Sequence, residues 1–408
     1  MLISSGGNCY LADMIEILIF MLLGLIVGIL FGLIPGLHPN TIVLLVPLLA
    51  QLSIAPLALI AFVVALGISN IFIDFIPSIL LGAPEAGSEL SVLPGHKLLM
   101  EGNGYDAVKL AVIGGLGSII FVLLALPLIL FTIPSIYEAS RPFTYALLIF
   151  IVLVMISREK GLRKRSAAFL CFLLAGLIGI FSSGLPVDNG VLLFPIFSGF
   201  FGVSVLIFSS KQKSKIPKRR KEIYVPGRQQ RRSIVFGSVG GIVSGLLPGV
   251  GSSEIASFAS VDKNGKSFLM TLGAITISNT LLSIMALWLI QKSRSGIATV
   301  LEQLVSIGFN EFIFIAAVAL LVAGLSAIIT LKLAKRSISI IEKLDYALVS
   351  RIVIIFIIMM TALFSGLFGL LLLATCTVLG IFARLAGIRR SVLMGVLILP
   401  TIIFYLPL

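Results

Sequence analysis

Two short phrases place helix-breaking and helix-starting residues inside apolar stretches of the chain. They are GLIPGLHPN at residues 32–40 and GLLPGVGSS at residues 245–253. Proline and glycine interrupt a membrane helix, while Asn, Thr and Ser are suited to open the next one. A helix opening carries unpaired N–H groups and the positive end of the helix dipole, so it attracts anions. Two openings that face each other near the membrane midplane would bind an anion without a buried Lys or Arg. The predicted binding residues are Pro35, Gly36, Asn40, Thr41, Pro248, Gly249, Gly251, Ser252 and Ser253.

Either phrase alone is better described as a proline kink that lets helices pack closely. Its recurrence favours the paired site, because the glycines before it recur as well. Gly24, Gly28 and Gly32 align with Gly237, Gly241 and Gly245, each 213 positions apart. After a slip of four residues, the triplet Ile-Ser-Asn at 68–70 matches the same triplet at 277–279. The pattern predicts two structural repeats.

Four polar residues in or beside apolar runs are candidates for binding a coupling ion. Asp74 lies well inside an apolar run, where a carboxylate is costly and a proton or Na⁺ relay is expected. The alternative is an Asp near an interface, or one paired with a backbone break around Pro77. Asn70 and Asn279 occupy matching positions and either coordinate a substrate oxygen or Na⁺, or simply bridge helices. Glu254 is a second candidate carboxylate, although an acid in the first turn of a helix is also stabilised by the dipole.

Two further features have less specific interpretations. His38 has no partner at a metal-ligand or catalytic spacing, which favours a hydrogen-bonded structural histidine. The long stretch at 80–106 interrupts the apolar runs and is a gate, a re-entrant segment or a cytoplasmic surface. No cofactor is expected. The coupling ion is Na⁺ or H⁺, and Na⁺ is the only metal ion expected, without an assigned ligand set.

The elements that position these residues are membrane helices. The chain has 408 residues, of which 59% are hydrophobic and 12% charged, with a mean hydropathy of +1.18. One soluble core cannot bury so much apolar surface, and continuous rather than alternating apolar runs indicate helices. No Lys or Arg precedes the first run, so a cleaved signal peptide is not expected. The 3 cysteines are scattered and form neither a disulfide framework nor a metal site.

The predicted class is an all-α polytopic membrane protein with two inverted-topology repeats and broken half-helices or re-entrant hairpins at the two Pro-Gly motifs. In the first half we expect segments at 14–34, 41–52, 57–80, 107–133, 142–157, 166–182 and 189–208. In the second half we expect 233–249, 252–261, 267–290, 311–331, 350–367, 368–383 and 391–407. Each half has an odd number of segments, so the second half enters the membrane from the opposite side.

The distribution of charge agrees with this count. If the N-terminus is outside, all 30 Lys and Arg except Arg141, Lys292 and Arg294 fall in cytoplasmic loops. We therefore expect a multi-pass protein of the cell membrane with both termini outside. The domains are a first transmembrane repeat at 1–208, a basic cytoplasmic linker at 209–232 and a second, inverted repeat at 233–408. The net charge of +13 reflects this topology, and nucleic acid is not an expected partner.

Four stretches resemble those of a known family: GLIPGLHPNT, DFIPSILLGAPEAGSELSVLPGHKLLMEGNGYDAVKLAVIGGLGS at 74–118, FPIFSGFFGVSVLIF and GLLPGVGSSEIASF. By these stretches the chain resembles the TctA family, the large membrane subunit of the tripartite tricarboxylate transporters. It implies a permease that carries carboxylates inward, driven by an ion gradient. It also implies an extracytoplasmic binding protein and a small membrane subunit as partners. By position it points to Pro35-Gly36, Asn40, Thr41, Asp74, Pro248-Gly249, Ser252 and Ser253.

The leading hypothesis is a secondary transporter for small organic anions, such as di- or tricarboxylates, in which one repeat rocks against the other. A transporter of an amphipathic lipid phosphate is the alternative, since paired helix openings would serve it equally well. An intramembrane enzyme is not expected, because the sequence has no HExxH motif, no nucleophile with a base and no paired membrane aspartates. The lipid bilayer is the other expected partner, and a homo-oligomer is left open.

Overall fold

The chain forms a bundle of helices. The computed structural model describes residues 4–33, 54–80, 92–187, 189–209, 223–246, 255–256, 265–290, 295–305, 307–341 and 346–406. No strand occurs in these ranges. The first half contains α1 (Ser4–Leu33), α4 (Pro56–Leu80), α5 (Val92–Met100), α6 (Gly104–Leu124), α7 (Leu126–Ser140), η3 (Arg141–Phe143), α8 (Thr144–Ser157), α9 (Leu162–Ser182), α10 (Asn189–Phe197), η4 (Ser198–Val203) and α11 (Ser204–Ser209). The second half contains α12 (Gly227–Leu246), α14 (Gly265–Ile290), α15 (Gly296–Leu304), α16 (Phe309–Ile341), α17 (Tyr346–Leu385), η5 (Arg390–Met394) and α18 (Gly395–Tyr405).

Seven of the described helices are long and apolar enough to cross a membrane, namely α1, α4, α6, α9, α14, α16 and α17. A further pair, α7 and α8, meets at a bend of 90° and forms a broken span or a re-entrant loop. Large apolar side chains on α1, such as Ile19 and Leu30, are half exposed, as expected for a helix that faces lipid. The predicted all-α polytopic class is confirmed.

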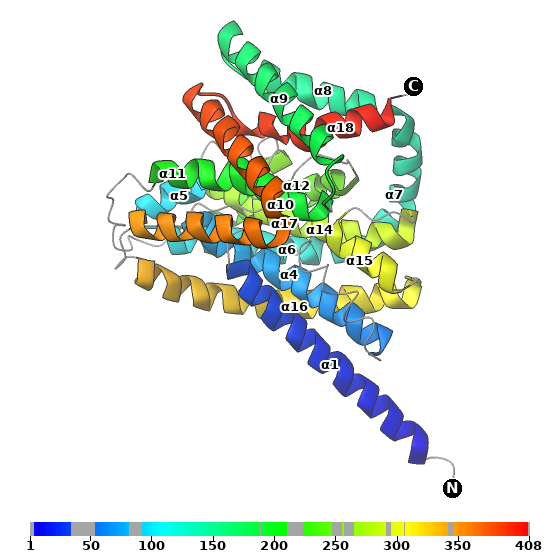
Figure 1. Ribbon diagram of the computed structural model, residues 1–408. Coiled ribbons are helices and arrows are strands. Elements are labelled where there is room, and N and C mark those ends of the chain that lie inside the picture. The colour runs from blue at the N-terminus through cyan, green and yellow to red at the C-terminus, as the bar shows by residue number, and fades with distance from the viewer. Residues whose placement is uncertain are drawn as a thin grey trace.

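Helix α4 lies at the centre of the larger part of the bundle. From Ala58 to Leu80 every residue except Ile71 is buried, because α1, α6, α15 and α16 pack around it. Its sequence is apolar on all sides, which suits a helix enclosed by protein rather than one with a single buried face. Helix α14 has the same role on the other side of α6, where α12 covers it (Figure 1).

A second hydrophobic core joins α8, α9, α10, η4, α17, η5 and α18 in the upper part of Figure 1. Its helices approach closely at glycines. A Cβ at Gly199 would lie 2.8 Å from the carbonyl oxygen of Leu373, and one at Gly395 would lie 2.8 Å from the ring of Phe172. These contacts join the first half of the sequence to the second, so the two predicted repeats interlock.

Several boundaries differ from the sequence-based segments. The predicted segment 107–133 is two helices, α6 and α7, which are separated at Ala125. The helices α5 and α15 lie in stretches that were not expected to be helical, and α16 continues ten residues beyond its predicted end at 331. The predicted segments 350–367 and 368–383 meet at Gly366, whose φ of 57° breaks α17. The segment 41–52, and 252–261 apart from residues 255–256, lie outside the described residues.

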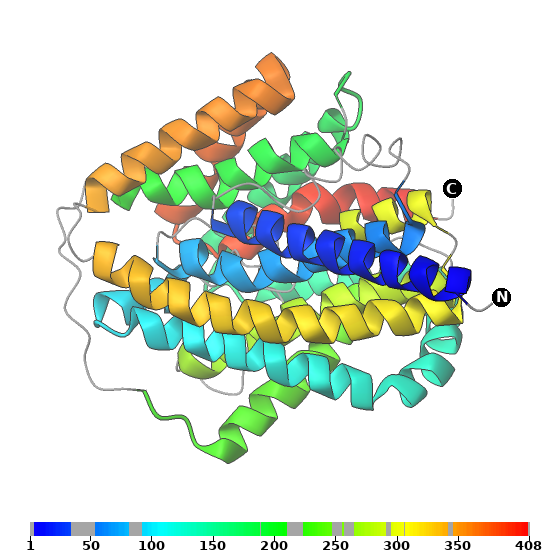
Figure 2. The same cartoon turned by 90° about the horizontal axis from the view of Figure 1, so that it is seen from below.

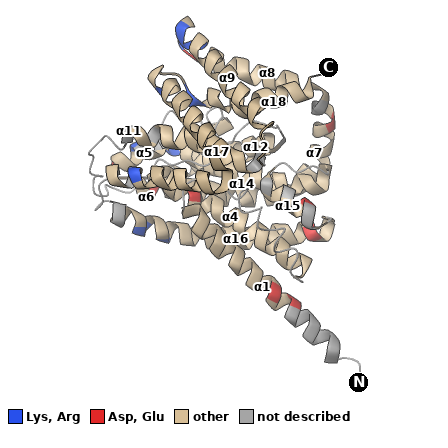
Figure 3. Cartoon of the chain, viewed as in Figure 1, with Lys and Arg blue, Asp and Glu red and all other residues tan. Residues whose placement is uncertain are grey.

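The charged ends of the bundle are separated in space. Figure 3 shows Lys and Arg at the left-hand ends of α5, α6 and α16 and at the upper-left ends of α9 and α17. The acidic residues of α1, α7 and α15 lie toward the right. The first turn of α1 and the last turn of α18 also lie on the right in Figures 1 and 2. Both ends of the described chain are therefore on the side opposite to the basic helix ends.

Candidate functional site

Most of the predicted binding residues lie outside the described part of the chain. These are Pro35, Gly36, Asn40, Thr41, Pro248, Gly249, Gly251, Ser252, Ser253 and the candidate coupling residue Glu254, together with His38. Asn70 and Asp74 on α4 and Asn279 on α14 are described. The structure also describes the helix ends that immediately precede both Pro-Gly motifs.

Helices α1 and α4 run parallel and side by side, as Figure 2 shows. At one end, the N–H of Ala55 donates a hydrogen bond of 3.0 Å to Glu16 Oε1. At the other end, a Cβ at Gly32 would lie 2.9 Å from the carbonyl oxygen of Asn70. Between these points, Gly24 and Gly28 lie directly against the backbone of α4, where they leave no room for a side chain. The glycines at every fourth position therefore form the contact between the two helices.

Helices α12 and α14 repeat this arrangement. Gln229 Nε2 donates a hydrogen bond of 2.6 Å to Ser267 Oγ at the start of α14. At the other end, a Cβ at Gly245 would lie 3.2 Å from Asn279 Oδ1. Gly237 and Gly241 lie against α14 in between. The four residues of α12 named here lie 213 positions after their counterparts in α1, which are Glu16, Gly24, Gly28 and Gly32.

The serine before each Asn makes the same contact in both pairs. Ser69 Oγ donates to the carbonyl oxygen of Ala65 at 2.7 Å, and Ser278 Oγ donates to that of Ala274 at 2.8 Å. Each hydroxyl also lies where a side chain at Gly28 or Gly241 would have to go. The two serines therefore complete the close helix contact and are not available to a ligand.

The described part of each glycine-bearing helix reaches the level of an Asn on its partner. In α1 the last described residue, Leu33, follows Gly32, which lies against Asn70, whereas α4 is described to Leu80, about 15 Å beyond Asn70 along its axis. The chain leaves α1 at this point and enters α4 beside Glu16, about 25 Å away along the pair. In the second pair, Gly245 in the last described turn of α12 lies beside Asn279, while α14 is described to Ile290. The Pro-Gly phrases are the next residues of the chain after these two helix ends.

Asn70 is the most unusual of the described candidates. Its side chain is 1% exposed, and within the described residues neither amide atom has a hydrogen-bond partner. Leaving a buried amide without partners costs free energy, so such groups are rare unless a ligand, an ion or water satisfies them. The amide has an acceptor oxygen and a donor nitrogen, which suit a cation or a carboxylate respectively.

Asp74 lies one helical turn beyond Asn70 and is 6% exposed. Helix α4 continues through Pro77 and ends about 9 Å beyond Asp74, so this carboxylate is not at the helix end. Ser78 Oγ donates a hydrogen bond of 2.7 Å to the backbone carbonyl oxygen of Asp74. Asn70 and Asp74 therefore share one face of α4.

Helix α6 brings the two Asn-bearing turns to the same level. At Gly115, in the middle of α6, a Cβ would lie 3.0 Å from Ile277 and 3.1 Å from Phe72. Two residues turn a helix by about 200°, so Asn70 and Asn279 face away from α6, and Asn279 Oδ1 lies beside Gly245 of α12. Ser118 Oγ fixes the same helix to α14 by donating 2.8 Å to the carbonyl oxygen of Ala274.

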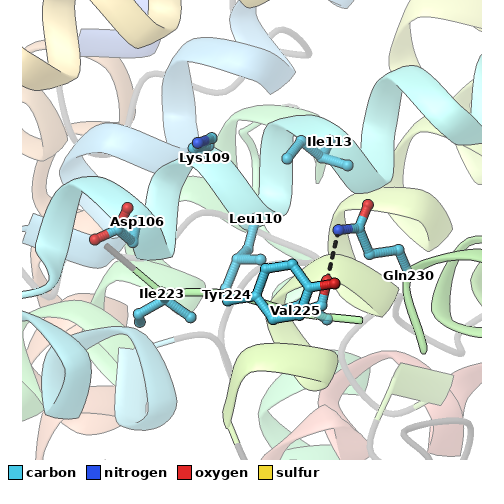
Figure 4. Close-up of a pocket in the computed structure, with 8 residues that line it drawn as sticks. All are labelled: Asp106, Lys109, Leu110, Ile113, Ile223, Tyr224, Val225 and Gln230. Atoms are coloured by element: carbon cyan, nitrogen blue, oxygen red, sulfur yellow. Dashed lines mark hydrogen bonds between the residues drawn. The ribbon is translucent and has the colours of Figure 1, made fainter. Parts of the chain in front are cut away.

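A separate pocket, which the sequence did not predict, lies between α6 and the residues 223–225 that precede α12. It encloses about 340 Å³ and is lined by Asp106, Lys109, Leu110, Ile113, Ile223, Tyr224, Val225 and Gln230 (Figure 4). Gln230 Nε2 donates a hydrogen bond of 2.8 Å to the carbonyl oxygen of Val225 and fixes this segment to the first turn of α12. None of the predicted site residues lines this pocket, and its lining combines apolar side chains with one acid and one cation.

Comparison with known proteins identifies the family. The uncharacterized protein MJ1079 of Methanocaldococcus jannaschii is 30% identical over 358 residues, which cover 85% of this chain and 88% of the relative. No solved structure matches the chain. Residues 18–395 match the sequence pattern of a family described as "Tripartite tricarboxylate transporter TctA family". This match confirms the resemblance found in the motifs. With nearly its whole length matched, the chain belongs to the TctA family of membrane transporters.

Proposed function

We propose that the protein is a secondary-active permease for small organic anions such as di- and tricarboxylates. The anion binds where α1 and α12 end, between the motifs that contain Pro35, Gly36, Asn40 and Thr41 and those that contain Pro248, Gly249, Gly251, Ser252 and Ser253. The observation that carries the proposal is the similarity of two pairs of parallel helices, α1 with α4 and α12 with α14. In each pair the last described turn of the glycine-bearing helix lies beside an Asn of its partner, and a Pro-Gly phrase follows in the sequence. Interrupted segments at corresponding positions of two repeats mark the substrate sites of secondary transporters.

Transport is coupled to Na⁺ or H⁺ through Asp74, Asn70, Asn279 and Glu254. The burial of Asp74 and Asn70 on one face of α4 supports this assignment. A carboxylate with a neighbouring amide oxygen offers the hard ligands that Na⁺ prefers, and the carboxylate alone can carry a proton. Movement of one repeat against the other would expose the site to each side of the membrane in turn.

The family suggests the partners and the location. We propose that an extracytoplasmic binding protein and a small membrane subunit deliver the anion, as the name of the tripartite family indicates. The protein would lie in the cell membrane with both termini outside and the basic 209–232 linker in the cytoplasm. The position of both chain ends opposite the basic helix ends supports this topology (Figure 3).

Ligand binding is the test that does not depend on the accessory subunits. The purified protein is heated with citrate or succinate, with and without Na⁺, and its unfolding temperature is measured. Uptake of the same labelled acids into proteoliposomes is then measured under an inward Na⁺ or pH gradient. We expect a carboxylate-dependent rise in unfolding temperature and gradient-driven uptake. Absence of both effects, together with transport of a lipid phosphate, would reject the carboxylate proposal in favour of the alternative.

The coupling role of Asp74 is tested by Asp74→Asn, with Asp13→Asn as the matched control because Asp13 is exposed on α1. We expect Asp74→Asn to lose the dependence of binding and uptake on Na⁺ or pH, while Asp13→Asn retains it. Unchanged ion dependence in Asp74→Asn would show that the coupling ion binds elsewhere.

A further inference from the structure

Two basic loops that are far apart in sequence lie together at one end of the second hydrophobic core. The first, at 158–165, connects α8 to α9 and includes the first turn of α9; the second, at 384–390, begins in the last turn of α17 and reaches the start of η5. The N–H of Arg389 donates a hydrogen bond of 2.9 Å to Glu159 Oε1, which joins the loops directly. Lys164 Nζ lies 3.3 Å from the position that a Cβ would take at Gly387. We call these two segments the paired basic loops.

The hydrogen bonds within the paired basic loops serve the backbone. Arg165 donates from Nε to the carbonyl oxygen of Glu159 at 3.1 Å and from Nη2 to that of Ser157 at 3.2 Å. Glu159 is buried, and it is the only acid that either loop contains. One of its carboxylate oxygens is engaged by the backbone N–H of Arg389. The loops are therefore fixed in place with an excess of positive charge.

Arg390 shows that this excess is costly. Its Nη1 atom is buried and has no hydrogen-bond partner within the described residues. Burial and the neighbouring Arg384 lower the pKa of Arg390 to about 10, and burial together with Arg389 lowers the pKa of Arg158. The positive-inside rule requires only that Lys and Arg stay in the cytoplasmic loops, where exposed side chains suffice. It does not explain why a guanidinium is buried beside other cations.

We propose that the paired basic loops bind a phosphate group, with Arg390, Arg389 and Lys164 as its ligands. Phosphate offers several acceptor oxygens, and guanidinium groups bind it with paired, charge-assisted hydrogen bonds. A bound phosphate offsets the repulsion among the cations, and a shift of the Arg390 side chain toward it gives Nη1 an acceptor. The group belongs to an anionic phospholipid, because exposed leucines flank the cations, with Leu162 80% exposed and Leu385 72% exposed. Basic pockets at the cytoplasmic ends of membrane helices recognise lipid headgroups in this way.

The site is tested by thermal unfolding of the purified protein in a neutral detergent. Phosphatidylglycerol, phosphatidylcholine and inorganic phosphate are titrated separately. We expect phosphatidylglycerol to raise the unfolding temperature with saturation and phosphatidylcholine to leave it unchanged. A shift with inorganic phosphate alone at millimolar concentration would assign the site to a free anion and overturn the lipid assignment. No shift with either phosphatidylglycerol or inorganic phosphate would overturn the proposal.

Variants connect the effect to the loops. Arg390→Met is expected to weaken the phosphatidylglycerol response about tenfold in half-saturating concentration, since it removes a charged donor that no other residue replaces. Arg389→Gln retains the backbone N–H that binds Glu159, so it tests the side chain without disturbing the contact between the loops. Lys335→Met is the matched control, because Lys335 is an exposed cation on α16 outside these loops. An equal loss in Lys335→Met, or an unchanged response in both loop variants, would refute the site.

Discussion

Replacing Asn70 by leucine is expected to stabilise the protein and abolish its transport. Asn70 is 1% exposed, and neither amide atom has a hydrogen-bond partner within the described residues. An unsatisfied buried polar group costs about 1–3 kcal/mol, and leucine fills a similar volume without polar atoms. Removing the amide therefore raises the free energy of unfolding by about 1–3 kcal/mol. With an unfolding entropy of about 2 cal/mol/K per residue, this corresponds to a rise of roughly 1–4 °C in unfolding temperature.

The functional half of this prediction is measured in the same preparation. If Asn70 binds the coupling ion or the anion, saturating ligand stabilises the wild type by about 2.7 kcal/mol at a hundred times its Kd. Asn70→Leu should lose this ligand-dependent shift as well as gradient-driven uptake. Asn310→Leu is the control, because Asn310 is exposed on α16 and its change should stay within about 0.5 kcal/mol.

Two outcomes would refute the reasoning. A lower unfolding temperature for Asn70→Leu would mean that the amide is satisfied in the folded protein and that its burial is not a cost. A variant that is more stable but retains wild-type uptake and ion dependence would mean that Asn70 is a tolerated defect and not part of the site.

Three further predictions concern the helices and the basic loops. Gly28→Val and Gly241→Val are each expected to lower the free energy of unfolding by more than about 3 kcal/mol, because a side chain would meet the backbone of the partner helix. Gly324→Val is the control, since Gly324 has open space around it, and thermal unfolding measures the difference. Equal effects in all three variants would contradict the close helix contact. Gly366→Ala should lower the free energy of unfolding by about 1–3 kcal/mol through backbone strain alone, since φ is 57° and no atom lies within 4 Å of the added Cβ. An unchanged unfolding temperature would show that the backbone at the break in α17 relaxes without cost. Arg390→Met should be more stable than the wild type at pH 8 without lipid, because the lowered pKa means that the folded state disfavours the charged guanidinium. Above pH 10 the unfolded state binds more protons at this site than the folded state, so the wild type gains stability as the pH rises. The difference in unfolding temperature between Arg390→Met and the wild type should therefore become smaller. A constant difference between pH 8 and pH 11 would contradict this prediction.

The sequence predicted the long apolar helices well but not every boundary between them. The apolar run 107–133 is continuous, so hydropathy alone did not reveal the break at Ala125. The pair Leu126-Pro127 contains the missing signal, because proline favours the first turn of a new helix. Helix α15 begins with an N-cap, in which Ser295 Oγ accepts a hydrogen bond of 3.2 Å from the N–H of Ala298. A search for Ser before a short apolar pattern would have found it.

The repeat alignment contained more information than the motifs that prompted it. Glu16 and Gln229 are 213 positions apart, as the glycines are, and each contacts the start of the next described helix. Their correspondence could have been read from the sequence. The packing of α6 against α14 could not, because the small residues Gly114 and Gly273 identify close contact but not the partner helix. The lack of a hydrogen-bond partner for Asn70 likewise depends on three-dimensional packing.

The parallel arrangement of α1 and α4 has a consequence for how the protein is made. Consecutive antiparallel helices can pair as they leave the insertion machinery, but a parallel pair must wait until the chain between them has crossed back. Contact between α6 and α14 comes later still, because Ser118 and Ala274 are 156 residues apart. The nascent first half therefore enters the lipid with the glycine face of α6 uncovered. Its final packing is completed only after the second half has been synthesised.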